Sequence, residues 1–260
     1  MPTRRVLLDA FSKWLVLQAL APGDVLAGPV RPKVRDWFAQ LRARAADLRT
    51  TKLAATAWQE EMERLAGDVP PDELCAAIDL DALAKKLTLP ESGFDTVKPW
   101  LPLMEGAENL PYRLKVFGLR QGTAIAPHGH RHLASMHLIL RGAFHVRHYE
   151  RRGDDEANLV LAESIDRVEV PGGRSSVSDQ RDNVHWLIAT EGPAYTLDVI
   201  VADLGGAWGL DFVDIDGARA GANGTLIAPR ITADQALRRY GHIERPSTIP
   251  LPLRGRGVTK

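Results

Sequence analysis

Apolar residues recur every three or four positions in the first third of the chain, which lines them up on one face of an α-helix. One such stripe runs over residues 34–48 and a second over 53–65. Pro70-Pro71-Asp72 is typical of a further helix start, and Asp79 or Asp81 can cap a short helix after it. We expect this N-terminal helical segment to pack on a core as scaffold, with a partner-binding arm as the alternative.

The pattern changes after Pro90, where prolines and glycines interrupt the chain, and from Tyr112 onward the apolar period falls towards two. Alternation of this kind predicts β-strands. The expected strands cover 112–119, 122–126, 135–140, 143–150, 159–161, 167–170, 175–178, 184–189 and 195–201. Many short strands with turns between them predict a mainly β, antiparallel barrel, with one hairpin tip at 152–156.

The strand signal fades beyond Leu204. Residues 216–224 are rich in glycine and predict a loop, whereas Thr232 can cap a short helix over 232–240. The last residues, rich in Pro, Arg and Gly, predict a partly disordered tail. The expected organisation is therefore a helical segment and linker over 1–105, a barrel over 106–204 and a C-terminal extension over 205–260.

The N-terminus permits two interpretations. Thr3-Arg4-Arg5-Val6-Leu7-Leu8 resembles the start of a twin-arginine export signal, and Ala19-Leu20-Ala21 fits a small-residue cleavage site. Charged Asp9, Lys13 and Asp24 interrupt the apolar stretch, which argues against a transmembrane helix. We favour an amphipathic helix over 5–20 in a cytoplasmic protein, with periplasmic export by a twin-arginine signal as the alternative.

Charge and cysteine content narrow the class of partner. The 260-residue chain has 33 basic and 33 acidic residues, so no net charge favours nucleic acid or an anionic membrane, and we expect neither as a partner. Its single cysteine, Cys75, excludes an intrachain disulfide framework. A reducing compartment is the simpler interpretation.

His128 and His130 are the strongest candidates for chemistry. Side chains at positions i and i+2 of a strand share a face, roughly 6.6 to 6.8 Å apart at Cα, so both imidazoles can reach one metal ion. His185, expected on a later strand, is the best candidate for a third ligand. A buried histidine held by a backbone acceptor is its alternative role, and His132 and His137 are rivals for the third place.

Gly122, the His128-x-His130 pair, Gly142 and the later His185 together resemble the two-part motif of the cupin superfamily. In most cupins a glutamate follows the second histidine by five residues, but here that position is Ser135. This loss is shared by the thiol dioxygenases, which bind iron through three histidines. Residues 138–149, 182–185 and 195–201 are similar to the cysteamine dioxygenase and plant cysteine oxidase branch.

The resemblance implies a cupin (jelly-roll) barrel that binds Fe(II) through His128, His130 and His185 and oxidises a small thiol or an N-terminal cysteine to a sulfinate with dioxygen. Three neutral imidazoles leave the ion its full double charge, which favours a thiolate. Two other functions stay open: a cupin metalloenzyme of another kind, such as a carbon-oxidising dioxygenase or an isomerase, and a non-catalytic module that binds a small molecule.

Several other residues are candidates for the lining of the pocket. Ser135, His137 and Tyr195 are the candidate catalytic residues, of which His137 is expected to share the inward face of Ser135. Other candidates are Trp186 as a lining residue and Arg113 and Arg120 as partners of a substrate carboxylate, although core aromatics and solvated arginines are the simpler roles. The remaining histidines, His145, His148 and His242, are predicted to be ordinary strand or surface residues.

Overall fold

The computed structural model describes residues 32–99 and 110–243. The predictions for the amphipathic helix over 5–20, the export signal and the tail beyond 243 lie outside the described residues. None of the helices in the described ranges is both long and apolar enough to cross a membrane.

In the part of the chain that the structure describes, four α-helices precede the sheet and one follows it. They are α2 (Pro32–Arg49), α3 (Ala55–Asp68), α4 (Pro71–Ala77), α5 (Leu80–Ala84) and α6 (Ala233–Tyr240). The stripe predicted over 34–48 is the buried face of α2, and the Asp79 side chain accepts a hydrogen bond from Ala82 N to cap α5. Thr232 and Gln235 form the reciprocal cap of α6, as the expected Thr232 cap requires.

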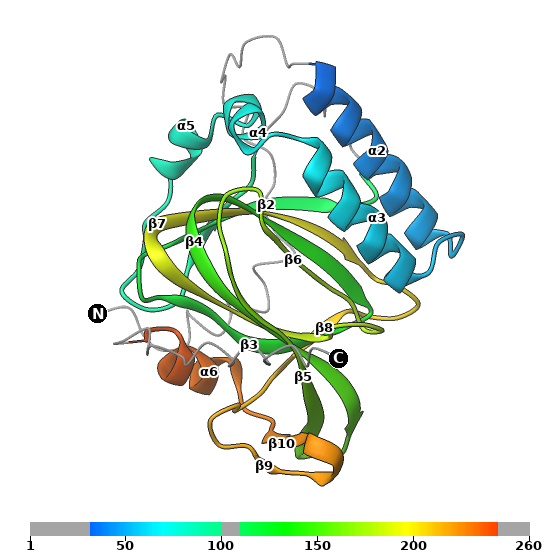
Figure 1. The fold of residues 1–260 in the computed structure, drawn as a ribbon, viewed down its shortest axis with the longest axis vertical. Coiled ribbons are helices and arrows are strands. Elements are labelled where there is room, and N and C mark those ends of the chain that lie inside the picture. The colour runs from blue at the N-terminus through cyan, green and yellow to red at the C-terminus, as the bar shows by residue number, and fades with distance from the viewer. Residues whose placement is uncertain (1–31, 100–109, 244–260) are drawn as a thin grey trace, which may run out of the picture.

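The described strands form one connected, antiparallel and strongly curved sheet (Figure 1). They are β1 (Asp95–Val97), β2 (Arg113–Leu119), β3 (Ala124–Arg131), β4 (Leu133–Asp154), β5 (Asn158–Glu169), β6 (Arg174–Val177), β7 (Val184–Ala202), β8 (Gly209–Phe212), β9 (Arg219–Ala220) and β10 (Leu226–Pro229). The expected mainly β chain, with an antiparallel barrel behind N-terminal helices, is confirmed.

Two long strands bend and so belong to both walls of the barrel. The first half of β4 pairs with β6 and with the second half of β7, which pairs in turn with β2. The second half of β4 pairs with β5 and with the first half of β7, which pairs with β3. We call these the β2 wall and the β3 wall. Gly142 lies at the bend of β4 with a φ of +75°, where a Cβ would lie 2.6 Å from the carbonyl oxygen of Glu191.

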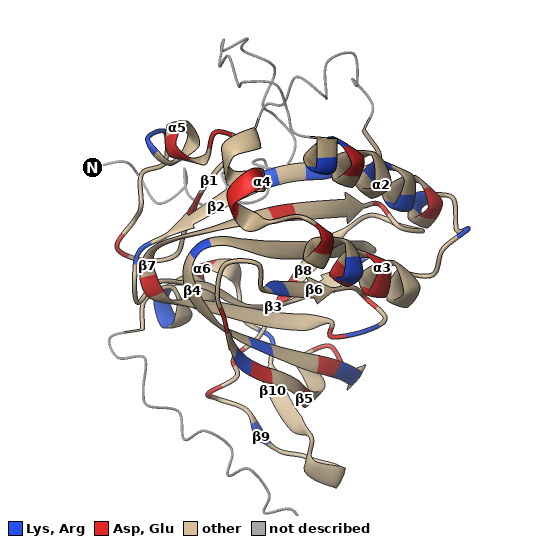
Figure 2. Ribbon diagram, turned by 45° about the horizontal axis from the view of Figure 1, so that its top comes forward, with Lys and Arg blue, Asp and Glu red and all other residues tan. Residues whose placement is uncertain are grey.

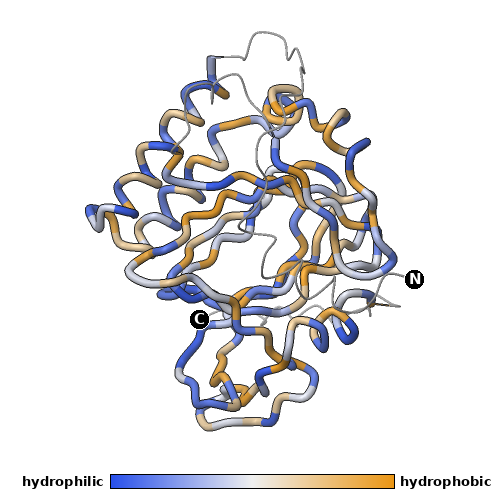
Figure 3. The backbone as a smooth tube through the Cα atoms, turned by 180° about the vertical axis from the view of Figure 1, so that it is seen from behind, coloured by the Kyte–Doolittle hydropathy of each residue, from blue (hydrophilic) through white to orange (hydrophobic). Residues whose placement is uncertain are grey.

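Helices cover the outer faces of both walls. Buried apolar residues of α2, α3 and α4 form one cluster with outward residues of the β2 wall such as Met136, Leu138 and Val199. On the β3 wall, Trp186 and Ile188 pack outward with Tyr240 of α6. In Figure 3 hydrophobic and hydrophilic residues alternate along these elements, and in Figure 2 charges of both signs are interspersed along α2 and α3.

The barrel continues beyond the segment that the sequence suggests. The predicted end of the strands at residue 204 is wrong, because β8 pairs with β3 beside His128 and β10 pairs with β5. The predicted loop over 216–224 contains the two residues of β9 and a short 3-10 turn. The division at 204 therefore does not coincide with an edge of the sheet.

Candidate metal centre

Two rows of side chains face each other inside the barrel. Across the β3 wall, Phe212, His128, His185 and His148 are direct partners on successive strands β8, β3, β7 and β4. Across the β2 wall, the corresponding row is Lys115, Asp198, His137 and Ser175, on β2, β7, β4 and β6. Directly opposed residues of an antiparallel sheet point to the same face, so each row presents its side chains together to the interior.

An irregularity in β3 directs the histidine pair inward. The register between β3 and β7 shifts between Ile125 and His128, so that Ile125 and His128 both contribute to the interior although three positions separate them. At this shift the ring of His128 donates through Nδ1 to the carbonyl oxygen of Ala126, 2.8 Å away. The hydrogen bond fixes the tautomer, because the proton on Nδ1 leaves Nε2 with a free lone pair.

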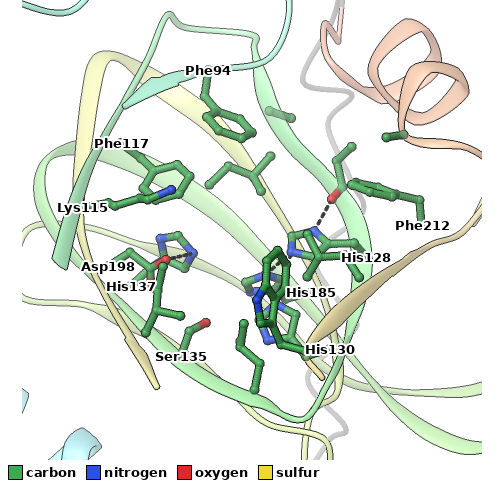
Figure 4. Close-up of a pocket in the computed structure, with 18 of the residues that line it drawn as sticks. Phe94, Lys115, Phe117, His128, His130, Ser135, His137, His185, Asp198 and Phe212 are labelled. Carbon is green, nitrogen blue, oxygen red and sulfur yellow. Dashed lines mark hydrogen bonds and ion pairs between the residues drawn. The ribbon is translucent and has the colours of Figure 1, made fainter. Parts of the chain in front are cut away.

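The three predicted ligands meet at one point. His128 Nε2 lies 3.2 Å from His130 Nε2 and 3.1 Å from His185 Nε2. All three histidines are buried. Within residues 32–99 and 110–243 they form the group that is able to hold a metal ion. Figure 4 shows their rings converging on one side of the pocket.

Burial keeps these imidazoles neutral. It lowers the pKa of His128 to about 4, against which the bond to Ala126 acts weakly. Burial, followed by the charges of neighbouring histidines, holds the pKa values of His130 and His185 well below the ordinary value. A neutral imidazole is the form that binds a metal.

The arrangement fits a divalent transition metal. Imidazole nitrogens bind such ions at about 2.0–2.1 Å, and two ligands at a right angle are then about 3 Å apart, close to the two measured separations. Without a cation, nitrogen lone pairs that face one another repel unless a ring proton lies between them. Three nitrogen ligands on one side leave coordination positions towards the pocket.

The opposite wall of the pocket is polar. Ser135 and His137 both line it, as the predicted inward face of β4 requires, and the Ser135 hydroxyl has no hydrogen-bond partner among the described residues. His137 Nδ1 is hydrogen-bonded to Thr196 Oγ1 at 3.0 Å, and His137 Nε2 lies 3.7 Å from Asp198 Oδ2. Burial lowers the pKa of His137 to about 3, so this ring is neutral as well.

Asp198 and Lys115 are pocket residues that were not predicted from the sequence. Burial raises the pKa of Asp198 to about 8, and the charge of Lys115 beside it opposes the shift. Figure 4 shows Lys115, Asp198 and His137 grouped on the side of the pocket away from the three histidines. The sequence offered one indication of them. Asp198 is the acidic residue among the mainly apolar residues 195–201 of β7, Lys115 is the lysine of β2, and the alternation of each strand points both side chains inward.

The pocket is a largely apolar space that is partly open to the outside. Its volume is about 120 Å³, roughly ten times what one enclosed water requires, which leaves room for a small organic molecule. Phe94, Phe117, Trp208 and Phe212 contribute to its walls. Phe212 belongs to β8, so the late strands take part in forming the site.

Four candidate pocket residues lie elsewhere. Tyr195 and Trp186 point outward from β7, Tyr195 towards the helical layer and Trp186 towards Tyr240, because each alternates with an inward residue. Arg113 is exposed near Asp203, and Arg120 pairs with Glu91 and the Leu89 carbonyl. Tyr195 is thus no candidate catalytic residue of this pocket, and neither arginine is placed to bind a substrate there.

The other histidines divide into three groups. His132, a rival for the third place, lies instead in the turn after the ligand pair, where Nδ1 donates to the Leu204 carbonyl, and His242 is exposed. His145 is buried on the outer face of β4, where Nε2 lies 2.6 Å from Asp166. His148 is not the ordinary residue expected, since it is buried inside the barrel beside His185. Strand alternation could have predicted this position, because His148 follows the inward residues Phe144 and Val146 at two-residue steps.

Comparison with known proteins leaves the family open. No family model matches the chain, and no curated protein matches it. Solved structures similar to it include KdgF from Halomonas sp., at 16% identity over 45% of this chain and 86% of that protein, with a TM-score of 0.32. A Klebsiella pneumoniae protein with a double-stranded beta-helix domain matches at 13% identity over 49% and 87%, with a TM-score of 0.33.

Procruciferin, an 11S globulin from Brassica napus, matches at 14% identity over 48% of this chain, with a TM-score of 0.35. The match spans 29% of the length of that globulin. At these identities and TM-scores the similarity carries no function across, so the assignment of the site depends on the chain's own residues.

Proposed function

We propose that the protein is an Fe(II)-dependent thiol dioxygenase that converts a small thiol or an N-terminal cysteine to a sulfinate. The observation that carries the proposal is the convergence of three buried, neutral imidazoles, His128, His130 and His185, on one point at the wall of a pocket. The resemblance of the same residues to the cupin motif, with Ser135 in the place of a carboxylate, supports it.

The charge of the ligand set favours a thiol. His128, His130 and His185 would hold the ion without neutralising it, so an anionic sulfur is attracted and the thiol loses its proton on binding. When bound, ferrous iron supplies the redox chemistry that joins dioxygen to sulfur. The reaction balances as R–SH + O₂ giving R–SO₂H, so both oxygen atoms end on sulfur and no external reductant is consumed.

The protein's own residues bind and orient the substrate. The aromatic walls exclude water, while Lys115 and the Asp198 carboxyl face the end of the substrate away from sulfur. Lys115 suits a carboxylate, and an ammonium group bound beside Asp198 would favour the ionised form of that carboxyl, whose pKa is about 8 before binding. The hydrogen bond between His137 and Thr196 fixes the orientation of the His137 ring in this wall of the pocket.

The test is thiol-dependent uptake of dioxygen by the Fe(II) protein. Cysteamine, cysteine, 3-mercaptopropionate and an N-terminal-cysteine peptide are added anaerobically, and at least one of them should perturb the spectrum of the metal. Admission of labelled dioxygen should then give a sulfinate carrying both labelled atoms, as measured by mass spectrometry. Preference for an amine-bearing thiol or for a carboxylate-bearing thiol would identify Asp198 or Lys115 as the anchor.

The apolar walls favour a second candidate function, a metalloenzyme acting on a non-sulfur substrate such as a phenol. If no thiol binds but an aromatic ligand does, that candidate replaces the first. Thiol binding without oxygen uptake would instead support a module that binds thiols without catalysis.

A further inference from the structure

A chain of buried polar side chains lies behind His185. Its Nε2 faces the candidate metal centre, and its Nδ1 faces Ser175 Oγ at 3.5 Å. Ser175 Oγ lies 2.7 Å from His148 Nε2. All three residues are buried, so water does not compete for these contacts.

The chain ends at a carboxylate. His148 Nδ1 faces Asp182 Oδ2 at 4.0 Å, an electrostatic contact rather than a direct hydrogen bond, and Nδ1 has no hydrogen-bond partner among the described residues. Ser164 Oγ donates to Asp182 Oδ1 at 2.5 Å. Although burial acts to raise the pKa of Asp182, the contacts with His148, Ser164 and Arg181 outweigh it and lower that pKa, so Asp182 is an anion.

A metal bound to His185 Nε2 would align the donors of this chain in one direction. If His185 Nε2 binds a metal, its proton is on Nδ1 and is donated to Ser175. The single hydroxyl hydrogen of Ser175 is then donated to His148 Nε2, which places the proton of His148 on Nδ1, facing Asp182. Each group therefore polarises the next towards the carboxylate.

The other two ligands have no such connection. His128 Nδ1 donates to the neutral carbonyl of Ala126, and His130 Nδ1 has no hydrogen-bond partner within the described ranges. Among the described residues, His185 is therefore the candidate ligand that a carboxylate supports from behind. The three histidine ligands include no carboxylate, but His185 is connected to the carboxylate of Asp182 through the side chains of Ser175 and His148.

We propose that Ser175, His148 and Asp182 form a relay of positioning residues that fixes the tautomer and ring orientation of His185 and strengthens it as a metal ligand. Partners of this kind behind a ligand typically change metal affinity by about 10- to 100-fold. The proposal rests on the metal-binding part of the proposed function and is independent of thiol oxidation.

Co(II) is a suitable probe, because its visible absorption reports on ligand strength and its affinity can be measured by competition with a chelator. We expect Ser175→Ala and Asp182→Asn each to weaken Co(II) binding about tenfold or more and to shift the absorption bands. Asn tolerates the positive φ of 52° at position 182, so that variant tests the charge without straining the backbone. Ser175→Thr, which restores a hydroxyl, should recover part of the affinity.

Matched controls lie next to the relay. Ser176→Ala removes a hydroxyl from the outer face of the same strand, where it bonds Glu63, and Asp166→Asn breaks the carboxylate–histidine pair with His145. Both controls should bind Co(II) with the affinity and spectrum of the wild type.

The double variant tests whether the residues act as one chain. Because Ser175→Ala already interrupts the relay, adding Asp182→Asn should cost little more. Fully additive losses, or unchanged affinity and spectra in both single variants, overturn the relay. A wild type that binds no Co(II) overturns it together with the metal centre, whereas a wild type that binds Co(II) but oxidises no thiol contradicts only the proposed reaction.

Discussion

At the scale of single residues, the three candidate ligands each present Nε2 to one point, but the partner of Nδ1 differs from one ring to the next. The ring of His128 is held by a backbone carbonyl, that of His185 faces a serine, and Nδ1 of His130 has no partner among the described residues. Besides its contact with His128 Nε2, a metal bond is therefore the polar interaction open to the buried ring of His130 among the described residues.

Replacing any of the three ligands removes one of the protein's bonds to the metal, and the described residues offer no carboxylate in the cluster to substitute for it. We expect His128→Ala, His130→Ala and His185→Ala each to lose iron, as measured by metal analysis of protein purified without a metal-binding tag. His242→Ala and His137→Ala should retain it. Near wild-type iron in the three ligand variants would rule out the assignment, and loss in His137→Ala would make that residue a ligand.

Ser135 tests the role of charge in the pocket. Ser135→Glu places a negative charge on the inner face of β4, which should offset part of the charge of the ion and weaken thiolate binding while iron stays bound. Ser135→Gln has nearly the same shape without the charge and serves as the matched control. Equal apparent thiol affinities in the Glu and Gln variants, measured from the metal spectrum, would contradict the electrostatic argument.

At the scale of elements, the position of β3 decides whether the site exists. Gly129 separates the two histidines of this strand, and a Cβ there would lie 2.7 Å from Asn183 Oδ1 and 3.1 Å from Val184 Cγ2. Asn183 in turn donates to the carbonyls of His130 and Ser178. The close approach of β3 and β7 thus requires glycine at this position.

We expect Gly129→Ala to push β3 away from β7, to destabilise the fold by about 1–3 kcal/mol and to lower metal affinity. Gly153→Ala, where nothing lies within 4 Å of the new Cβ, is the control and should change neither property. Urea unfolding and chelator competition measure the two effects. Wild-type metal affinity in Gly129→Ala would show that the spacing of these strands does not determine the site.

Local pattern predicted the helices and most strands because those signals lie within a few residues. The stripe of α2, the cap of α6 and the inward phase of Ser135 and His137 are of this kind. The polar row of Lys115, Asp198 and Ser175 depends instead on which strands pair and in what register, and that is set by distant parts of the chain. Short β8 has too few residues to alternate visibly.

At the scale of the whole molecule, the barrel separates its interior into two regions. One end is filled by an apolar cluster that includes Phe117, Ile139, Phe144 and Leu187. The other holds the two polar rows and the pocket, so several titratable groups are buried close to one another there. Burial of such groups makes stability depend on pH.

Asp198 allows that dependence to be measured. Its pKa is raised to about 8 in the folded protein, against about 3.9 in an unfolded chain. The folded state thus favours the protonated carboxyl. Its contribution to the stability of the folded state is fully present below about pH 4 and is lost as pH rises through about 8. Asp198→Asn keeps the shape of the side chain and cannot titrate. The wild type should therefore lose stability relative to Asp198→Asn between pH 5 and 8, on the order of 1 kcal/mol per pH unit.

Urea unfolding of both proteins at each pH measures the difference, with Asp166→Asn on the outer face of the barrel as the control for loss of one carboxylate. The control should follow the wild type. Parallel curves for the wild type and Asp198→Asn would mean that Asp198 ionises as it does in water, and the pocket wall would then be open to solvent. A difference confined to this range would instead place a buried, titratable acid opposite the three histidines, where it can respond to the charge of whatever binds there.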